Sequence, residues 1–561
     1  MMAGMTETPH PLYDRHADTL NRALTAITER GYWSAYPESP SPRVYGETAA
    51  ADGKAAFEAY LKADFPLDQP GDGQTVATEV SPFGVELDVR YPHATADQLV
   101  AAASAALPAW RDAGPQARAG VCLEILDRLH RNVFELANAV QFTSGQAFVM
   151  AFQAGGAHAL DRALEAIAYA YAEMTRHPAT AGWEKAAGKG DPLRMTKTFH
   201  VVPRGVALVI GCNTFPTWNS YPGLFASLAT GNPVIIKPHP RAVLPLAITA
   251  KYARQVLAEA GFDPNLVQLA PEAPGEKLAS TLALHPAVKI VDFTGSTEYG
   301  DWLEANARQA AVYTEKAGLN TVVIDSTDDF VGMCRNLGFT LTLYSGQMCT
   351  TSQNLLIPRD GIETDQGHKS FDEVAAGIAG AVGKLTADPA RGVELTGAIV
   401  NDGVLERLEE VTKVGEPVLE SRTVEHPSFP GAVVRTPTIV KLDAADTATY
   451  SREWFGPISF AIATDSTAHS LDILRSTVGE KGALTAGVYS TDEAVLDAAE
   501  GVAIDAGVHL SCNLTGGVFV NQSAAFSDFH GSGANPAANS ALTDGAYVSN
   551  RFRIVQSRRH V

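Results

Sequence analysis

Short apolar runs alternate with longer helical stretches along the middle of the chain. The runs typical of buried strands lie at 206–210, 234–236, 266–270, 289–293 and 311–314. The stretches with helical spacing between them lie at 220–230, 242–260, 275–284 and 298–309. This alternation predicts an α/β fold in which helices cover both faces of a parallel sheet. Ligands of such sheets bind beyond the carboxyl ends of the strands, so the residues that follow each run are the first candidates for chemistry.

The regions before this pattern are predicted to be helical or irregular. Three helical stretches, at 95–110, 115–137 and 156–174, have the apolar spacing of packing helices. Residues 1–80 combine two helical stretches, at 20–30 and 53–62, with segments rich in Pro and Gly. We expect residues 1–80 to form an N-terminal extension that lies on the surface.

The second half of the chain predicts further α/β structure. A strand-like run at 321–324, a helical stretch at 339–344 and another strand-like run at 354–358 follow in that order. The end of the chain has the pattern of a strand at 551–557. A terminal strand needs a partner edge, which we expect a neighbouring subunit to supply in a homodimer or homotetramer.

Composition narrows the class of protein. At 561 residues the chain exceeds a single hydrophobic core, so two or more domains are expected. A hydrophobic content of 45% suits a globular protein, and no apolar run approaches the roughly 20 residues of a membrane helix. The formal net charge of −20 disfavours a nucleic-acid partner, because phosphate binding needs a basic surface.

The cysteines and the N-terminus predict a cytoplasmic protein. Five cysteines without Cys-x-x-Cys spacing argue against a disulfide scaffold and a structural zinc site, and they suit a reducing compartment. Residues 1–9 show no basic region followed by an apolar core, so no signal peptide is expected. No cluster of His, Asp and Glu shows ligand spacing, so no metal is expected either.

Cys349 lies in a Gly346-Gln-Met-Cys349 turn between a helical stretch and a strand-like run. A free cysteine is most often a buried structural residue. A turn at this place would instead set the thiol at the mouth of a cleft, where it could act as a nucleophile. Motifs elsewhere in the chain favour the second interpretation.

Two strand ends carry residues suited to a dinucleotide. The turn Thr-Gly295-Ser296-Thr continues into a helix start through Gly300, and such a turn offers backbone N–H groups and a helix dipole to a pyrophosphate. At the other end, Lys237 leaves its strand before Pro-His239-Pro and would reach ribose or phosphate oxygens. An ordinary glycine turn and a solvated lysine would explain the same features without a ligand.

Five motifs in a fixed order make the chain resemble the aldehyde dehydrogenase superfamily. They are Lys237-Pro, Phe293-Thr-Gly-Ser-Thr-Glu298, Glu315-x-x-Gly318, Gly346-Gln-Met-Cys349 and Glu453-x-Phe455-Gly-Pro457. The resemblance covers roughly residues 75–561. Within the superfamily, the stretch Gly211-Cys-Asn-Thr-Phe-Pro-Thr-Trp218 and the N-terminal extension most resemble the semialdehyde dehydrogenases of phenylacetic acid degradation.

The resemblance implies a Rossmann-type cofactor domain, an α/β catalytic domain and a small β element for oligomerisation. Residues 81–183 and 203–316 would form the NAD(P)-binding domain, 317–525 the catalytic domain, and 184–202 with 545–561 the oligomerisation strands. The implied reaction is oxidation of a small-molecule aldehyde to its acid with NADP or NAD. In the phenylacetic acid branch the aldehyde is a CoA-linked semialdehyde.

The resemblance also implies roles for individual residues. Cys349 would attack the aldehyde, and Glu315 would activate the water that releases the acid from the thioester. Relatives that pass the acyl group to CoA often lack this glutamate, so hydrolysis is favoured over CoA acylation. A non-catalytic scaffold would be expected to lose one of the two residues, and both are present. The implied cofactor-binding residues are Lys237, His239, Gly295, Ser296, Gly300, Glu453 and Phe455.

Two departures from the family pattern affect the oxyanion hole and the cofactor. The oxyanion asparagine of the family directly precedes Phe-Pro, where this chain has Thr214, with Asn213 one residue earlier. We expect a local shift to bring Asn213 into place, with Thr214 as the alternative. NAD-preferring relatives carry a glutamate where this chain has Pro240, and the loss of that carboxylate favours NADP over NAD. The expected substrate-channel residues are Trp218, Phe455, Phe526 and Phe529.

Overall fold

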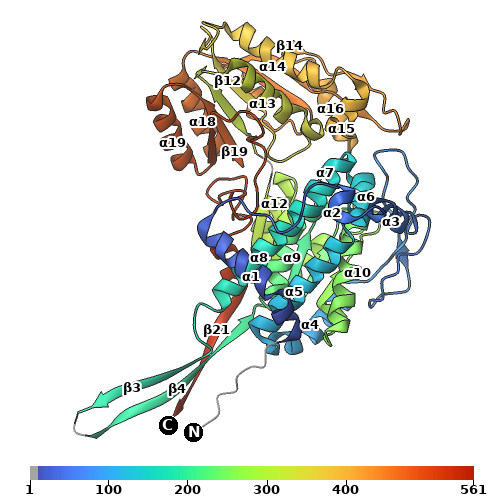
Figure 1. The fold of residues 1–561 in the computed structure, drawn as a ribbon, viewed down its shortest axis with the longest axis vertical. Helices are drawn as coiled ribbons and strands as arrows, with labels where there is room; N and C mark the ends of the chain where they lie inside the picture. Colours follow the sequence, from blue (N-terminus) through green and yellow to red (C-terminus); the bar gives the residue numbers. More distant parts are fainter. Residues whose placement is uncertain (1–9, 189, 317) are drawn as a thin grey trace.

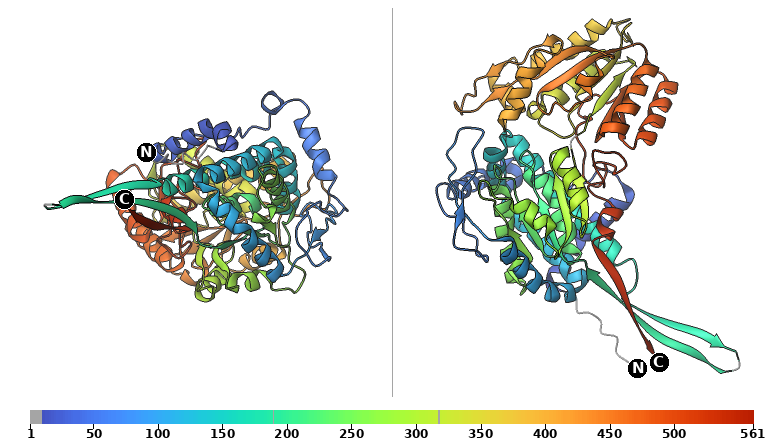
Figure 2. Two further views of the ribbon diagram at one scale, coloured as in Figure 1. Left: turned by 90° about the horizontal axis from the view of Figure 1, so that it is seen from below. Right: turned by 180° about the vertical axis from the view of Figure 1, so that it is seen from behind.

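The computed structural model describes residues 10–188, 190–316 and 318–561. The chain forms two lobes, and a long β arm projects from the lower one (Figure 1). The two further views in Figure 2 show the same arm extending away from the rest of the chain. Residues 1–9, on which the absence of a signal peptide was predicted, lie outside the described residues. Among the described helices, none has the length and apolar character needed to cross a membrane.

A five-stranded parallel sheet forms the centre of the lower lobe. Its strands, in spatial order, are β7 (Val267–Leu269), β6 (Val234–Lys237), β5 (Val206–Ile210), β8 (Val288–Thr294) and β9 (Ala311–Glu315). All five predicted strands are confirmed to within one residue at each end. The chain passes from β5 outward to β7 and then returns to β8, so a topological switch point lies between β5 and β8.

Helices cover both faces of this sheet, as predicted. Along β5, Val206, Leu208 and Ile210 belong to the core on one face, and Ala207 and Val209 belong to the core on the other. The helices are α4 (Ala96–Asp112), α11 (Leu278–Leu284) and α12 (Thr297–Asn306) on the first face, and α5 (Gly114–Arg131), α8 (Ala159–Met174), α9 (Pro216–Ala229) and α10 (Leu244–Glu259) on the second.

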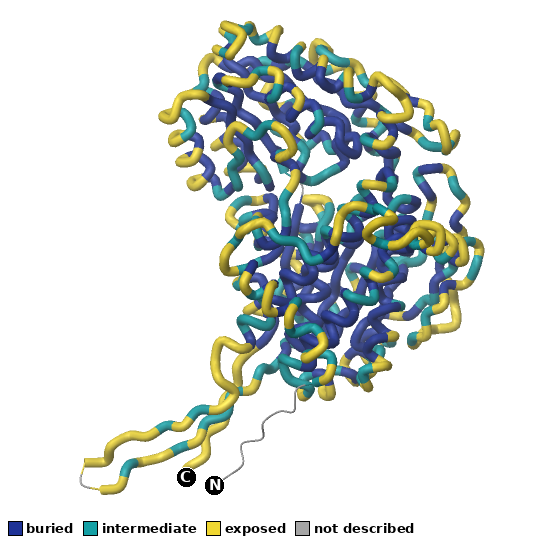
Figure 3. The backbone as a smooth tube through the Cα atoms, in the orientation of Figure 1, coloured by how far each residue is buried: buried dark blue, intermediate teal, exposed yellow. Residues whose placement is uncertain are grey.

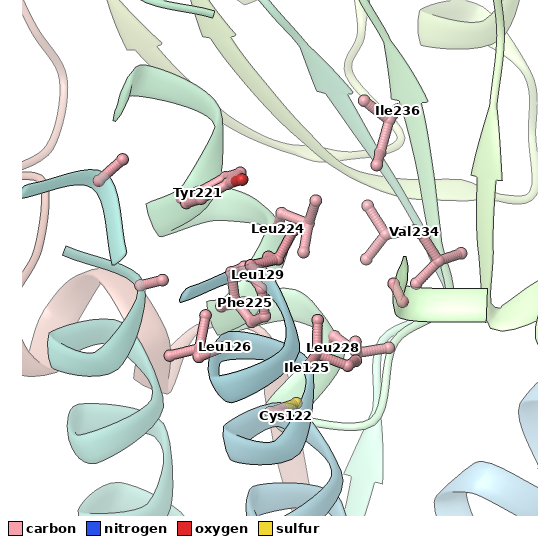
Figure 4. Close-up of a cluster of buried hydrophobic side chains, with 14 of the residues drawn as sticks. Cys122, Ile125, Leu126, Leu129, Tyr221, Leu224, Phe225, Leu228, Val234 and Ile236 are labelled. Carbon is pink, nitrogen blue, oxygen red and sulfur yellow. The ribbon is translucent and has the colours of Figure 1, made fainter. Parts of the chain in front are cut away.

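The second helical layer packs closely on the sheet. Figure 4 shows Cys122, Ile125, Leu126 and Leu129 of α5 near Tyr221, Leu224, Phe225 and Leu228 of α9 and near Val234 and Ile236 of β6. Burial raises the pKa of the Cys122 thiol above its ordinary range, which identifies a structural cysteine. The helix predicted at 115–137 is two helices, α5 and α6 (Val133–Ser144), because the helical path is interrupted at Asn132.

The N-terminal extension lies against the outside of this layer and buries one side of its first helix there. Its helix α1 (Pro11–Glu29) contacts α5 and α8, and Leu20 and Ala23 are buried in the shared core. Two shorter helices follow, α2 (Pro42–Tyr45) and α3 (Ala49–Glu58), and α3 packs on α6. The segment is anchored because apolar positions recur at helical spacing on one side of α1.

The upper lobe is built on a seven-stranded sheet in which only β14 runs antiparallel to its neighbour. Its strands, in spatial order, are β14 (Glu416–Leu419), β17 (Thr438–Asp443), β18 (Ile458–Thr464), β12 (Asn354–Pro358), β10 (Thr321–Ile324), β19 (Thr485–Tyr489) and β20 (His509–Cys512). The strands predicted at 321–324 and 354–358 are confirmed residue for residue. The covering helices are α13 (Phe330–Thr342) and α14 (Phe371–Leu385) on one face, and α18 (Thr467–Lys481) and α19 (Glu493–Ala506) on the other.

The arm is a three-stranded antiparallel sheet of β3 (Thr180–Ala187), β4 (Gly190–Pro203) and β21 (Phe552–His560). The expectation that a neighbouring subunit supplies the partner of the terminal strand is wrong, because β21 pairs with β4 of the same chain. Most of the arm is exposed (Figure 3), including the apolar side chains of Leu193 and Val555. The segments predicted for oligomerisation fall largely on these strands, although their last part begins with the helix α20 (Gly545–Ser549).

Candidate active site

Cys349 follows a strained turn that leaves α13. Three consecutive residues, Tyr344, Ser345 and Gly346, have φ values of 52°, 50° and 63°, a region disfavoured for residues with a Cβ. The Ser345 hydroxyl donates to the Arg435 carbonyl at 2.8 Å and helps to hold this conformation. A Cβ at position 346 would clash with a neighbouring backbone carbonyl, so glycine is required there. The local strain is therefore concentrated beside the thiol.

Two amide side chains fix the backbone around Cys349. Gln347 hydrogen-bonds two backbone groups of the 398–400 segment, each at 3.0 Å. Asn320 donates to the Cys349 carbonyl at 2.7 Å. Because Asn320 lies five residues after Glu315, the segment that carries the predicted base also positions the predicted nucleophile.

Cys349, Glu315 and His530 form a compact cluster. Their sulfur, oxygen and nitrogen atoms all lie within 4.8 Å of one another. His530 Nε2 is 4.0 Å from Cys349 Sγ and 3.2 Å from Glu315 Oε2. Burial, together with the Glu315 carboxylate, raises the pKa of the Cys349 thiol well above its ordinary range. A donor or a cation is therefore needed to stabilise the thiolate.

Glu315 ends β9, where the sequence predicted it, and its side chain is buried. Its Oε1 accepts a hydrogen bond from the Asn219 amide at 3.1 Å. Among the described residues, no donor is aligned for a hydrogen bond with its Oε2. A buried carboxylate oxygen without a hydrogen bond is costly, and here it is available to accept a proton.

Asn213 is not placed as predicted. Its amide donates to the Thr143 carbonyl at the end of α6, at 3.2 Å, so the expected local shift does not occur. Thr214 is partly exposed, and its hydroxyl hydrogen-bonds with the Cys212 thiol. Cys212 in turn is close enough to Cys349 to contribute to its raised pKa. The two adjacent side chains thus have different partners, the Thr143 carbonyl for Asn213 and the Cys212 thiol for Thr214.

A cavity of about 640 Å³ opens beside the cluster. Its lining includes Cys349, Asn219 and His530 together with the aromatic side chains of Tyr32, Trp33, Phe215, Trp218, Phe339 and Phe519. The N-terminal extension supplies part of this wall, which sequence patterns did not predict. Its Ser34 hydroxyl donates to Asp161 of α8 at 2.6 Å and holds the extension in place.

Of the four aromatic residues predicted for the substrate channel, one lines the large cavity. Trp218 lines the cavity, and Phe455 lines a smaller hollow that also reaches Cys349. Phe526 is fully buried and Phe529 packs beneath an arginine side chain, so neither belongs to the lining. Other residues of this segment line the cavity instead, namely those at 521–525, 527, 528 and 530.

Glu453 shares the smaller hollow with Phe455 and Cys349. The side chain of Gln353 accepts the Trp454 N–H at 2.7 Å and ties this loop to the segment that follows the nucleophile. Burial raises the pKa of Glu453 to about 7, and an arginine charge nearby lowers it in part. The loop thus sets a carboxyl group and an aromatic ring beside the thiol.

Lys237 ends β6 and forms a buried ion pair with Glu272, which follows the neighbouring strand β7. A carboxylate thus stands beside Lys237 even though Pro240 lacks one. His239 turns inward, because its Nδ1 accepts the backbone N–H of Arg241 at 3.1 Å. Burial and the positive charge of Lys237 lower the pKa of His239 to about 4, so it is neutral at pH 7 and does not attract a phosphate.

The turn after β8 offers fewer anion-binding groups than predicted. The Gly295 N–H already donates to the Glu315 carbonyl at 3.1 Å. The Gly300 N–H donates within α12, and the absence of a Cβ there makes room for a lysine side chain. Ser296 caps α12, so the first N–H groups of this helix remain as donors. Gly295 and Gly300 therefore shape the turn, and the free N–H groups follow Ser296 at the start of α12.

Three residues of the site were missed in the sequence: Asn219, Glu272 and His530. Asn219 follows Trp218 directly, and His530 precedes a glycine, but neither signal identifies a role. The cluster of Cys349, Glu315 and His530 also contains the residue types of a metal site, although their separation along the sequence shows no ligand pattern. Only the fold brings these residues together.

Known proteins provide an independent comparison. The sequence profile of the Aldehyde dehydrogenase family matches residues 72–542. A crystal structure of NAD-dependent aldehyde dehydrogenase from Burkholderia multivorans is 62% identical, covers 99% of this chain and 100% of that chain, and has a TM-score of 0.98. The 1-pyrroline-5-carboxylate dehydrogenase 1 of Halalkalibacterium halodurans is 25% identical over 436 residues, which are 75% of this chain and 78% of the relative. The Thermus 1-pyrroline-5-carboxylate dehydrogenase with bound NAD shares the fold, with 20% identity, a TM-score of 0.73 and coverage of 95% and 99%.

Proposed function

The chain belongs to the aldehyde dehydrogenase family, and from that premise we propose that it oxidises an aldehyde to the carboxylic acid through a thioester on Cys349. The observation that supports the proposal is the pairing of the Cys349 sulfur with the Glu315 carboxylate, within 4.8 Å, beside the large cavity. One group can attack a carbonyl carbon, and the other can take a proton from water next to the same atom.

In the first half-reaction the Cys349 thiol loses its proton and its sulfur attacks the aldehyde carbon. The negative charge that forms on the oxygen is stabilised by the Cys349 backbone N–H and by the Thr214 hydroxyl. Thr214 takes this role because the Asn213 amide is engaged with Thr143. A nicotinamide dinucleotide, when bound, supplies the hydride acceptor for the tetrahedral carbon. A thioester on Cys349 remains.

In the second half-reaction Glu315 removes a proton from the water that attacks this thioester. The acid leaves and the Cys349 sulfur is regenerated. The Asn219 amide holds Glu315 Oε1 at 3.1 Å, which directs the other oxygen toward the water. Because a positioned base is present, we assign hydrolysis to this site and not transfer of the acyl group to CoA.

The proposed cofactor is NAD. The prediction of NADP rests on the missing carboxylate at Pro240, and Glu272 supplies a carboxylate beside Lys237. A carboxylate at this position can accept hydrogen bonds from ribose hydroxyls and repels a 2′-phosphate. The name of the Burkholderia multivorans relative, an NAD-dependent aldehyde dehydrogenase, supports the same choice. The other residues proposed to hold the dinucleotide are Ser296, Glu453 and Phe455.

The proposed substrate is a neutral aldehyde with an aromatic ring or a group of similar size. Aromatic side chains form much of the cavity wall, and its charged residues are acidic: Glu38, Asp161, Glu394 and Asp528. Among the described lining residues none is Lys or Arg. Such a wall disfavours the carboxylate of 1-pyrroline-5-carboxylate, for which curated relatives are named. A CoA-linked semialdehyde, as in phenylacetic acid degradation, would have to keep its phosphates outside the cavity.

We propose that the arm joins subunits in a dimer or tetramer. It projects from the lobe, and its outer surfaces carry exposed apolar residues, including Leu193 and Val555. The division into a cofactor domain at 81–183 and 203–316 and a catalytic domain at 317–525 is likewise proposed, with support from the two separate sheets.

A panel of aldehydes tests the function. Phenylacetaldehyde, glutamate semialdehyde and a CoA-linked semialdehyde would be compared by NADH formation and by identification of the product. We expect the highest kcat/KM for the neutral aromatic aldehyde, with a free acid as product. Cys349→Ala should be inactive with every aldehyde and bind NAD as the wild type does. Turnover by Cys349→Ala refutes the nucleophile, and preference for either anionic aldehyde refutes the substrate class.

A further inference from the structure

His530 is a buried histidine of the site that belongs to none of the family motifs. Only 5% of the residue is exposed, and its ring meets that of Trp218 at 4.6 Å between centroids. Its backbone carbonyl accepts the Leu542 N–H at 2.9 Å, which fixes the residue from behind. The imidazole is thus held in one place, with Nε2 directed toward Cys349 and Glu315.

A chain of hydrogen bonds leads from Arg162 through Ser523 to the ring of His530. Arg162 Nη2 donates to the Ser523 hydroxyl oxygen at 3.1 Å, and Ser523 Oγ lies 3.2 Å from His530 Nδ1. Because Arg162 supplies the hydrogen of the first contact, the Ser523 hydroxyl keeps its own proton, and we assign that proton to a hydrogen bond with His530 Nδ1. In the neutral imidazole Nδ1 is then the acceptor, and Nε2 carries the hydrogen.

His530 Nε2 lies within hydrogen-bond reach of Cys349 Sγ, at 4.0 Å. It is also 3.2 Å from Glu315 Oε2, with which it is not aligned for a hydrogen bond. We propose that His530 is a catalytic residue that donates its Nε2 hydrogen to the Cys349 sulfur and stabilises the thiolate before it attacks. The S–H bond breaks, its proton passes to the adjacent Glu315 carboxylate and on to solvent in the cavity, and the electron pair stays on sulfur. His530 keeps its own proton throughout.

The proposal explains how a thiolate forms in an unfavourable environment. Burial and the Glu315 carboxylate oppose ionisation of Cys349, and the thiol of Cys212 adds to the effect. The charged groups behind His530 balance each other, because Arg162 is paired with Glu165 at 2.8 Å. His530, as a neutral hydrogen-bond donor in contact with the sulfur, is therefore the group that can stabilise the thiolate form of Cys349.

The inference rests on the proposed role of Cys349 as nucleophile, and thiol alkylation tests it without substrate or cofactor. Iodoacetamide labelling of Cys349 would be followed by mass spectrometry of its peptide between pH 6 and pH 10. His530→Met and His530→Gln are matched in size, and only glutamine retains a donor. We expect the midpoint of labelling to rise by about one pH unit in His530→Met and the rate at pH 7.5 to fall about threefold to tenfold. His530→Gln should recover part of this loss.

Ser523→Ala provides a second test that leaves the ring in place. It should shift the labelling profile in the same direction by a smaller amount, because the tautomer is no longer fixed. Profiles of His530→Met and Ser523→Ala that match the wild type overturn the proposal. If His530→Met does not fold, the Ser523→Ala profile decides alone. Activity retained by Cys349→Ala would instead refute the proposed function, while the labelling profiles would still report the contact with His530.

Discussion

Replacement of Glu315 by glutamine should slow one half-reaction and make the nucleophile more reactive at the same time. Glutamine keeps the shape of the side chain and an oxygen for the Asn219 amide, but it cannot take a proton from water. It also removes the negative charge that raises the pKa of the Cys349 thiol. The same substitution should therefore slow deacylation and favour ionisation of the Cys349 thiol.

The size of the second effect follows from the separation of the two groups. The reactive atoms lie within 4.8 Å. A unit charge at that distance contributes about 3.5 kcal/mol at an effective dielectric constant near 20 and about 0.9 kcal/mol in water. Loss of the charge should therefore lower the pKa of Cys349 by about 0.6 to 2.5 units. Loss of the general base should reduce steady-state turnover by about 10²- to 10⁴-fold.

Two measurements on Glu315→Gln separate the effects. Rapid mixing with aldehyde and NAD should give a burst of NADH close to one equivalent per site, followed by a stall with an acyl group on Cys349. Iodoacetamide labelling without substrate should proceed faster than in the wild type at pH 7. Asp301→Asn is a suitable control, because it removes a carboxylate that pairs with Lys316 away from the thiol. Unchanged steady-state turnover, or a labelling rate below that of the wild type, would contradict the roles given to Glu315.

Two further substitutions test the oxyanion hole and the cofactor site. Thr214→Val should reduce kcat by about 10²- to 10³-fold. Asn213→Ala should leave kcat near normal and lower the free energy of unfolding by about 1–3 kcal/mol, since it removes the donor to the Thr143 carbonyl. A loss of kcat confined to Asn213→Ala would instead support the prediction that Asn213 stabilises the oxyanion. Glu272→Gln should tighten the Kd for NADP by about tenfold to a hundredfold, measured by fluorescence titration, because a charge repelling the 2′-phosphate is lost. Glu276→Gln, in the same loop but bonded to His93, should not change it, and an unaltered Kd in Glu272→Gln would remove that residue from the cofactor site.

The strands and helices were predictable because their signal is local. Alternation of apolar runs placed β5 and β10 residue for residue, and each needed only its own sequence. Residues 115–137 were predicted as one helix, because nothing in the apolar pattern marks the break at Asn132 between the two observed helices. The packing of α1 was missed for another reason: its apolar side is meaningful only once α5 and α8 are in place to cover it.

The site was less predictable because it depends on side-chain direction and on contacts between distant segments. Asn213 and Thr214 are adjacent in sequence, yet their side chains contact different groups, the Thr143 carbonyl and the Cys212 thiol, and no sequence pattern predicts this difference. Glu272 places a carboxylate beside Lys237 where Pro240 lacks one, but it follows a different strand. Comparison with the family motif around Lys237 therefore could not identify Glu272. His530 is separated from Cys349 by 181 positions, and only the fold shows that the two side chains meet.

The reacting pair lies where the two lobes join. Glu315 ends the last strand of the lower sheet, β10 begins the upper sheet at Thr321, and Asn320 between them bonds the Cys349 carbonyl at 2.7 Å. The base and the nucleophile are thus tied through one short connection that lies at the junction of the lobes. The lining of the large cavity likewise comes from both lobes, so a substrate bound there would meet the thiol and the carboxylate at this junction.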